Sequence, residues 1–278
     1  MIVSNFRTKE AIPNHIILIS FALLAILPIL VLFFNSIKPF SEFGLNPLGP
    51  PSEIRIQNFP DAWIAGEYSK IFFNSSKLVI GSVILCLSVS LLAGFSLAKL
   101  NPKGSSAIAI YLLVGISIPA QLYILPLFLL WKELSLLNTH LGLIIIYSAL
   151  NAPFATFLIR SYMIRLPDEL FDAAKIDGAN IFQQFFRVAI PLSWPVLLTS
   201  ALVVGLAVWN EFLFALTFVQ DENLKPISTI LFAFSWRFIN NQALVSAASI
   251  MMVAPVVILF LLFQKRFISG LTSGGVKG

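Results

Sequence analysis

The sequence predicts an all-α integral membrane protein with six transmembrane helices. Of its 278 residues, 58% are hydrophobic and only 11% are charged, whereas an ordinary soluble domain carries about 25% charged residues. The mean hydropathy is +0.90, and the few charged side chains divide the chain into long apolar runs. A water-soluble globule could not cover its surface with so few charges, so this class of protein is excluded.

Each apolar run is long enough to cross a bilayer as one helix, because about 20 residues at a rise of 1.5 Å span about 30 Å of hydrocarbon. Apolar residues fill all faces of these helices, whereas a helix of a soluble protein has one apolar face. The first run follows two basic residues, as a secretory signal does, but it is longer than a signal core, and we expect an uncleaved helix. The charge-free runs are 11–37, 78–98, 104–131, 134–159, 188–210 and 238–264.

The basic residues favour an N-terminus in the cytoplasm, because cytoplasmic loops carry an excess of Lys and Arg. With that orientation, eleven of the 18 basic residues fall on the inner side and seven on the outer side. We therefore expect both termini in the cytoplasm. The segment 38–70 would lie outside, and its prolines and glycines predict an ordered loop rich in turns.

The segment between the fourth and fifth runs, 160–191, is mixed in charge and predicts two short helices. Pro167 followed by Asp168 and Glu169 favours a helix start, where acidic side chains meet the positive end of the helix dipole. Gly178 favours the end of this helix. The residue pattern alone fits either a projection that binds a partner or a helix pair that lies on the membrane surface.

A second, amphipathic helix is predicted directly after Gly178. Phe182, Phe185, Phe186 and Ala189 are spaced i, i+3, i+4, i+7 and would share one apolar face, with Gln183, Gln184 and Arg187 on the other side. Pro191 then marks the entry into the fifth span.

The same segment resembles the EAA loop of the membrane subunits of bacterial ATP-binding cassette (ABC) importers. That pattern is Glu-Ala-Ala, three residues, Gly, nine residues, then Ile, any residue, Leu-Pro. Asp172-Ala173-Ala174, Gly178 and Val188-Ala189-Ile190-Pro191 reproduce its spacing. Asp172, Val188 and Ile190 depart from the pattern but keep the sign of charge or the apolar character.

Further segments resemble carbohydrate importer permeases, with the maltose-type second permease subunit as the nearest likeness. They are Leu125–Phe128, Leu136–Leu143, Phe157–Arg160, Trp209–Phe212 and the tail 270–278. The resemblance implies a type I importer fold divided into three parts. Residues 1–70 form the N-terminal cytoplasmic segment, first helix and external loop; residues 71–264 form the permease domain with its EAA loop at 165–191; residues 265–278 form a cytoplasmic tail.

The resemblance also implies the partners of a bacterial inner-membrane importer. They are a second related permease, a dimer of ATPase subunits and an extracytoplasmic solute-binding protein. The helix from Asp168 to Lys175 would couple to the ATPase. The implied coupling residues are Asp168, Glu169, Asp172, Ala173, Ala174, Asp177 and Gly178. We expect no catalytic residue and no cofactor in this chain, since no phosphate-binding loop occurs, and ATP and magnesium would bind the partner ATPase.

Glu211 is the only acidic residue that we assign to a predicted span, and a buried charge in hydrocarbon is costly. It would face the bundle interior as a pathway or gate residue, together with Asn210 and Asn151. Alternatively, it would make a structural hydrogen bond to a neighbouring helix or lie near the outer interface. Pro119 and Pro153 interrupt the third and fourth runs and indicate either bends around a cavity or simple packing.

Other classes of protein fit the sequence less well. An ion-coupled secondary transporter needs several intramembrane charges, and a membrane enzyme needs clustered acids or histidines. The net charge of +5 comes from scattered basic residues, so we expect no nucleic-acid partner. One cysteine and two isolated histidines predict no metal site. An importer of a non-sugar solute, such as glycerol phosphate or a polyol, differs from the preferred reading only in substrate.

Overall fold

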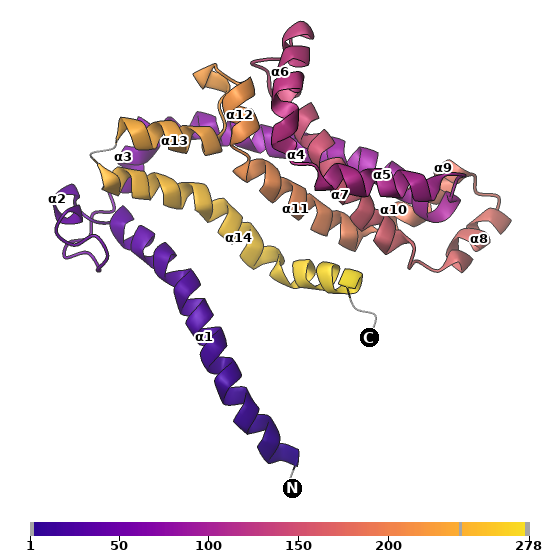
Figure 1. The fold of residues 1–278 in the computed structure, drawn as a ribbon, viewed down its shortest axis with the longest axis horizontal. Helices are drawn as coiled ribbons and strands as arrows, with labels where there is room; N and C mark the ends of the chain where they lie inside the picture. Colours follow the sequence, from indigo (N-terminus) through magenta and orange to yellow (C-terminus); the bar gives the residue numbers. More distant parts are fainter. Residues whose placement is uncertain (1–2, 239–240, 276–278) are drawn as a thin grey trace. The chain divides into compact units, whose positions relative to one another are not determined.

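The computed structural model describes residues 3–238 and 241–275, with side chains described for 14–229, 231–238 and 241–264. Over these residues the chain is helical, without a strand (Figure 1). The α-helices are α1 (Val3–Ser36), α2 (Phe40–Phe43), α3 (Asn58–Ala65), α4 (Tyr68–Phe95), α5 (Ser105–Ser117), α6 (Ile124–Glu133), α7 (His140–Met163), α8 (Asp168–Ile176), α9 (Ile181–Gln184), α10 (Ile190–Leu192), α11 (Trp194–Asn210), α12 (Leu213–Phe218), α13 (Ile227–Arg237) and α14 (Gln242–Gly275). Two π-helical turns, Ser96–Leu100 and Phe185–Ala189, and two 3-10 turns, Ala120–Tyr123 and Glu222–Leu224, complete the elements.

Within the described part of the chain, four helical segments are long and apolar enough to cross a membrane, and two bent helix pairs bring the total to six when each pair counts as one span. The straight segments are Asn14–Ser36, Tyr68–Leu100, His140–Met163 and Gln242–Gln264. The bent pairs are Ser105–Ser117 with Ala120–Glu133, and Ile181–Leu192 with Trp194–Asn210. All six predicted runs therefore coincide with candidate spans.

The third and fifth spans are bent helix pairs and not continuous helices, and a bend of the third span is one of the two readings that Pro119 left open. The third bends by 91°, and the break falls where Ile118 takes an extended conformation before Pro119. A proline disfavours the helical conformation of the residue before it and lacks an N–H group, which favours the end of the helix here. The fifth bends by 73° between α10 and α11.

The helices fall into two compact units. The first unit comprises Met1–Tyr68 and Leu231–Pro255. Its core includes Tyr68, whose ring meets Phe234 edge-on at 6.5 Å between centroids and whose hydroxyl donates a 3.1 Å hydrogen bond to the carbonyl of Ala248. The second unit comprises Ser69–Ile230 and Val256–Gly278. The candidate site residues all lie in the second unit.

The segment after α1 is an ordered loop, as its prolines predicted. The Lys38 side chain is fully buried, and its ammonium donates hydrogen bonds to the side-chain oxygen of Asn35 and the carbonyl of Asn46. The Asn58 amide donates to the carbonyls of Ser36 and Lys38 at 3.0 and 2.8 Å. These bonds tie the start of α3 to the end of α1.

In the second unit, α4 and α7 approach closely along small residues. A Cβ at Gly94 would lie 2.8 Å from a methyl carbon of Ile159. The Ser90 hydroxyl donates a 3.2 Å hydrogen bond to the carbonyl of Ala152, and Ser148 donates at 3.2 Å to that of Ser82. Small residues and interhelical hydrogen bonds of this kind hold helices together in lipid, where burial of apolar surface gives no driving force.

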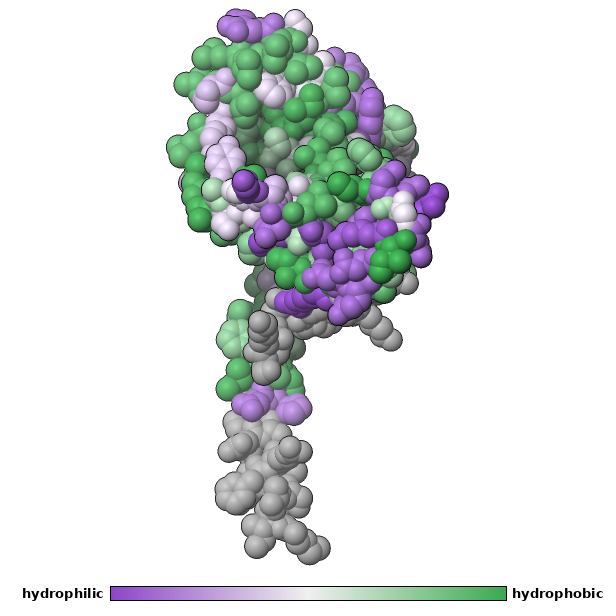
Figure 2. Space-filling model, turned by 90° about the vertical axis from the view of Figure 1, so that its right-hand side faces the viewer, coloured by the Kyte–Doolittle hydropathy of each residue, from purple (hydrophilic) through white to green (hydrophobic). Residues whose placement is uncertain are grey.

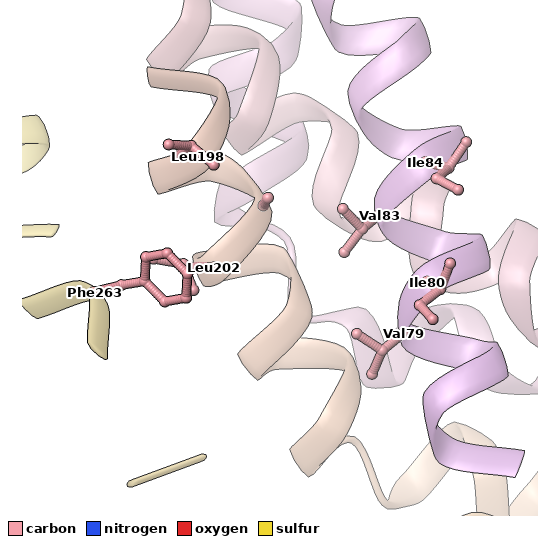
Figure 3. A pocket seen from close by; sticks show the side chains of 8 residues that line it. Val79, Ile80, Val83, Ile84, Leu198, Leu202 and Phe263 are labelled. Atoms are coloured by element: carbon pink, nitrogen blue, oxygen red, sulfur yellow. The ribbon is translucent and has the colours of Figure 1, made fainter. Parts of the chain in front are cut away.

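A groove between α4 and α11 lines one apolar face of the second unit, with a volume of about 270 Å³. Figure 3 shows Val79 and Val83 of α4 opposite Leu198 and Leu202 of α11, with Phe263 of α14 at the edge. Every residue that lines the groove is apolar. Such a surface suits hydrocarbon rather than water.

Candidate functional site

The segment between α7 and α11 forms the first half of the candidate site, and its first helix is the predicted one. Pro167 is extended immediately before α8, Asp168 and Glu169 lie in the first turn, and Lys175 lies in the last. Gly178 follows the helix with a φ of +82°, a conformation that favours glycine. The predicted start and stop of this helix are confirmed.

One residue of α8 anchors the helix to the bundle. Phe171 is buried, and its ring lies 6.3 Å from that of Phe95 at the end of α4, while Phe95 contacts Phe185 at 5.3 Å. The opposite face of α8 points outward. Of the predicted coupling residues, Asp168, Glu169, Asp172, Ala173, Asp177 and Gly178 are exposed and Ala174 is half-buried.

The α8 end of the second unit faces the viewer in Figure 2, and hydrophilic side chains gather on it. Asp172 and Lys175 form an ion pair of 2.9 Å within this exposed face. The exposed face of α8 is thus largely charged, while Leu170 and Ile176 on the same helix are also exposed.

A lysine at the end of the second span holds the N-terminal end of α8. The Lys99 ammonium lies 2.6 Å from the Asp168 carboxylate and donates a 2.7 Å hydrogen bond to the carbonyl of Leu166. It also lies 4.9 Å above the Phe171 ring. The hydrogen bond and the positive charge of Lys99 lower the pKa of Asp168. This contact was not predicted, because an isolated lysine after an apolar run indicates only on which side of the membrane the span ends.

The second predicted helix differs from the expected one. A capping box of Asn180 and Gln183 starts α9, but the chain then widens into the π-helical turn Phe185–Ala189. Phe185 and Ala189 are buried as predicted. The other half of the predicted apolar face is not: Phe182 and Phe186 are 73% and 62% exposed.

Gln184, predicted on the polar side, is instead buried and donates a 3.0 Å hydrogen bond to the carbonyl of Ala179. A π-helical turn accommodates an extra residue, so Phe186 and the positions after it no longer follow the 3.6-residue period on which the prediction rested. Phe182 and Gln184 precede this turn, which therefore does not explain their positions.

The second half of the site is the end of the fifth span, where α11 stops at Asn210 and α12 begins at Leu213. Glu211 lies in this break. Its carboxylate accepts hydrogen bonds from the backbone N–H groups of Phe214 at 2.8 Å and Ala215 at 3.1 Å, and from the Tyr147 hydroxyl at 2.7 Å. Its backbone carbonyl accepts a 2.6 Å bond from the Ser228 hydroxyl.

The two asparagines of the predicted pathway set lie close to Glu211 in different ways. Asn210 directly precedes it in the chain, and Asn151 lies on α7, the helix that carries Tyr147. Asn210 is exposed, and its amide donates to the carbonyl of Leu206 at 2.9 Å. Asn151 is half-buried one turn after Tyr147 and donates to its carbonyl at 2.8 Å. Sequence reasoning missed Tyr147, since 64 residues separate it from Glu211 and no local pattern joins them.

These features define a helical transport protein of the membrane, with apolar spans, bent helices and a polar projection between two of them. The chain belongs to the family of binding-protein-dependent transport system inner membrane components, whose model matches residues 90–273. It is a multi-pass permease of the inner membrane and a transport subunit.

Named relatives match along nearly the whole chain. The arabinooligosaccharides transport system permease protein AraQ of Halalkalibacterium halodurans is 36% identical, with 98% of this chain and 99% of the relative covered. The melibiose/raffinose/stachyose import permease protein MelC of Bacillus subtilis is 32% identical, with 91% of each covered.

The fold matches a solved structure of the same class. A chain of a bacterial ABC transporter involved in the import of the acidic polysaccharide alginate superposes with a TM-score of 0.82 at 24% identity, and the match covers 94% of this chain and 97% of that one. The predicted type I ABC importer fold is therefore confirmed.

Proposed function

We propose that the chain is one of the two permeases of an ATP-driven, binding-protein-dependent carbohydrate importer and forms half of its translocation pathway. The observation that carries the proposal is the full-length similarity to permeases named for oligosaccharide transport. A third such relative, the diacetylchitobiose uptake system permease protein NgcG of Streptomyces coelicolor, is 31% identical over 94% of the chain. The alternative of glycerol phosphate or a polyol as substrate finds no comparable support.

In this proposal α8 is the coupling helix and binds an ATPase subunit through its exposed face. Glu169, Asp172 and Ala173 point away from the bundle, whereas Phe171 holds the helix in place. ATP and magnesium bind the ATPase dimer, and closure of that dimer moves α8. A second, related permease completes the pathway, and a solute-binding protein delivers the sugar on the outer side. The family name supports the binding protein, since it describes a binding-protein-dependent transport system.

The break at Glu211 is the proposed gate or pathway element. A break in the helix leaves backbone N–H and carbonyl groups available, whereas a continuous helix pairs these groups within itself. Asn210, Glu211 and Asn151 are the side chains assigned to it. Their carbonyl, amide and carboxylate groups suit the hydroxyls of a sugar.

The orientation belongs to the same proposal. An ATPase in the cytoplasm requires α8 on the cytoplasmic side, and an even number of spans then leaves both termini on that side. The excess of basic residues on the inner side supports this arrangement.

The test is purification of the affinity-tagged chain from its native membrane, followed by reconstitution of the complex into liposomes. We expect a second permease and an ATPase to co-purify, and vanadate-sensitive ATP hydrolysis to rise with binding protein and an arabino-oligosaccharide or raffinose. Glycerol 3-phosphate serves as the control solute. A chain that purified alone and transported without an ATPase would refute the proposal.

A further inference from the structure

We propose that Lys99 is a positioning residue that links the coupling helix to the second span, so that movement of α8 is passed to α4. The inference rests on the proposed function, because it takes α8 as the element that the ATPase moves. It adds a residue of the permease itself, outside the EAA loop, to the coupling machinery.

The first argument is the number of contacts that one ammonium group makes. An ammonium has three N–H donors, and that of Lys99 contacts the Leu166 carbonyl, the Asp168 carboxylate and the Phe171 ring together. All three partners belong to the turn before α8 or to α8 itself. A single side chain of the second span therefore holds both the entry and the first turns of the helix.

The second argument is burial. The Lys99 side chain is only 6% exposed, whereas both partners of the nearby Asp172–Lys175 pair are about 60% exposed. Exposed ion pairs contribute little, since water and salt screen them. The Asp168 carboxylate is 81% exposed, but the Lys99 ammonium is nearly buried and is therefore screened less. Its separation from Asp168 would leave a buried charge with only the Leu166 carbonyl and the Phe171 ring as partners.

The third argument is that Lys99 and the aromatic rings have separate structural roles. Phe171 packs on Phe95 and therefore keeps α8 on the bundle without the help of the lysine. Lys99 fixes the orientation of α8, because it binds the N-terminal end of this helix to the turn that directly follows α4. It lies in the π-helical turn Ser96–Leu100, a geometry that is often found at functional sites.

The experiment uses the reconstituted complex and compares Lys99→Gln with Lys99→Arg and Lys103→Gln. Glutamine removes the charge but keeps a hydrogen-bond donor, whereas arginine keeps the charge. Lys103 is exposed on the next loop, so Lys103→Gln removes the same charge near the same end of α4 without touching α8. Uptake and binding-protein-stimulated ATP hydrolysis are measured on each sample.

For Lys99→Gln we expect sugar uptake per ATP hydrolysed to fall about tenfold, a usual size for coupling between two sites. Hydrolysis itself stays within about twofold of wild type, since the outward face of α8 is unchanged. Lys99→Arg retains at least about a third of the wild-type ratio, and Lys103→Gln leaves it unchanged. A purely structural role would lower uptake and hydrolysis together.

An unchanged ratio of uptake to hydrolysis in Lys99→Gln would overturn the inference, as would an equal loss of both activities. If Lys99→Gln does not assemble, Asp168→Asn decides, because it breaks the ion pair while Lys99 keeps the Leu166 carbonyl. A lower ratio in complexes that bind the ATPase as tightly as wild type supports the inference, and an unchanged ratio refutes it. Failure of the wild-type complex to couple sugar uptake to hydrolysis would refute the proposed function instead.

Discussion

The hydroxyl of Tyr147 donates a 2.7 Å hydrogen bond to the carboxylate of Glu211 and so joins α7 to the break at the end of α11. The same carboxylate accepts two backbone N–H groups at the start of α12. Both groups would otherwise lack a helical partner, as the first N–H groups of every helix do. One acidic side chain therefore holds the break open and fastens it to the neighbouring helix.

Removal of the Tyr147 hydroxyl tests the contribution of this bond. We expect Tyr147→Phe to destabilise the purified complex by about 1.5–3 kcal/mol, the range for a hydrogen bond to a charged group. Glu211 keeps its two backbone partners, so uptake is retained. Thermal unfolding in detergent provides the measurement, with Tyr111→Phe as the control, because Tyr111 is 75% exposed. Equal stability of the two variants would contradict the prediction.

Replacement of Glu211 tests the gate. Glutamine offers one acceptor oxygen where the carboxylate offers two, so Glu211→Gln cannot satisfy Phe214, Ala215 and Tyr147 together. We expect sugar uptake to fall about tenfold or more, which corresponds to a loss of at least about 1.4 kcal/mol. Uptake of labelled oligosaccharide and coupled hydrolysis are measured in liposomes. If both match wild type, Glu211 has no role in the pathway.

Gly178 offers a test of the loop that follows the coupling helix. At a φ of +82° a residue with a side chain is strained by about 1–2 kcal/mol, but no atom lies within 4 Å of the position that its Cβ would take. We therefore expect Gly178→Asp to insert and assemble while uptake separates from ATP hydrolysis. Blue-native electrophoresis follows assembly. Normal uptake in this variant would count against the coupling assignment.

Close packing of α4 on α7 gives a prediction about stability. A Cβ at Gly94 would meet Ile159 at 2.8 Å and the backbone nitrogen of Arg160 at 3.3 Å. We expect Gly94→Val to destabilise the bundle by about 1–3 kcal/mol, as overpacking does. Gly115→Val is the matched control, because the nearest atom there lies 4.0 Å from the added Cβ. The unfolding temperature of each variant is measured, and an equal decrease in both would refute the packing argument.

The distribution of charge predicted the spans well, because a charged side chain is excluded from hydrocarbon whatever the details of packing. The prolines predicted the breaks in the helices less well. The chain breaks at Pro119, yet α7 continues through Pro153 and α14 through Pro255. Neighbouring helices decide whether a proline breaks a membrane helix or is absorbed, and a single sequence does not reveal those neighbours.

The site was predictable where its signals are local. Asp168 and Glu169 mark the start of α8 and Gly178 marks its end. Because these residues stabilise the ends of their own helix, their spacing in the sequence was enough to predict it. Lys99 and Tyr147 act on residues 69 and 64 positions away, and only the fold brings these pairs together. The exposure of Phe186 was not predicted, because this residue lies in a π-helical turn. Such a turn is wider than an α-helical one and rotates the residues that follow onto a different face of the helix.

The exposed rings of Phe182 and Phe186 bear on how the complex is made in the cell. Phe182 lies in α9 and Phe186 in the π-helical turn Phe185–Ala189, and their side chains are 73% and 62% exposed. In the proposed importer, a permease synthesised in excess of its partners would keep these two aromatic rings exposed, and chaperones and proteases recognise exposed apolar surface of this kind.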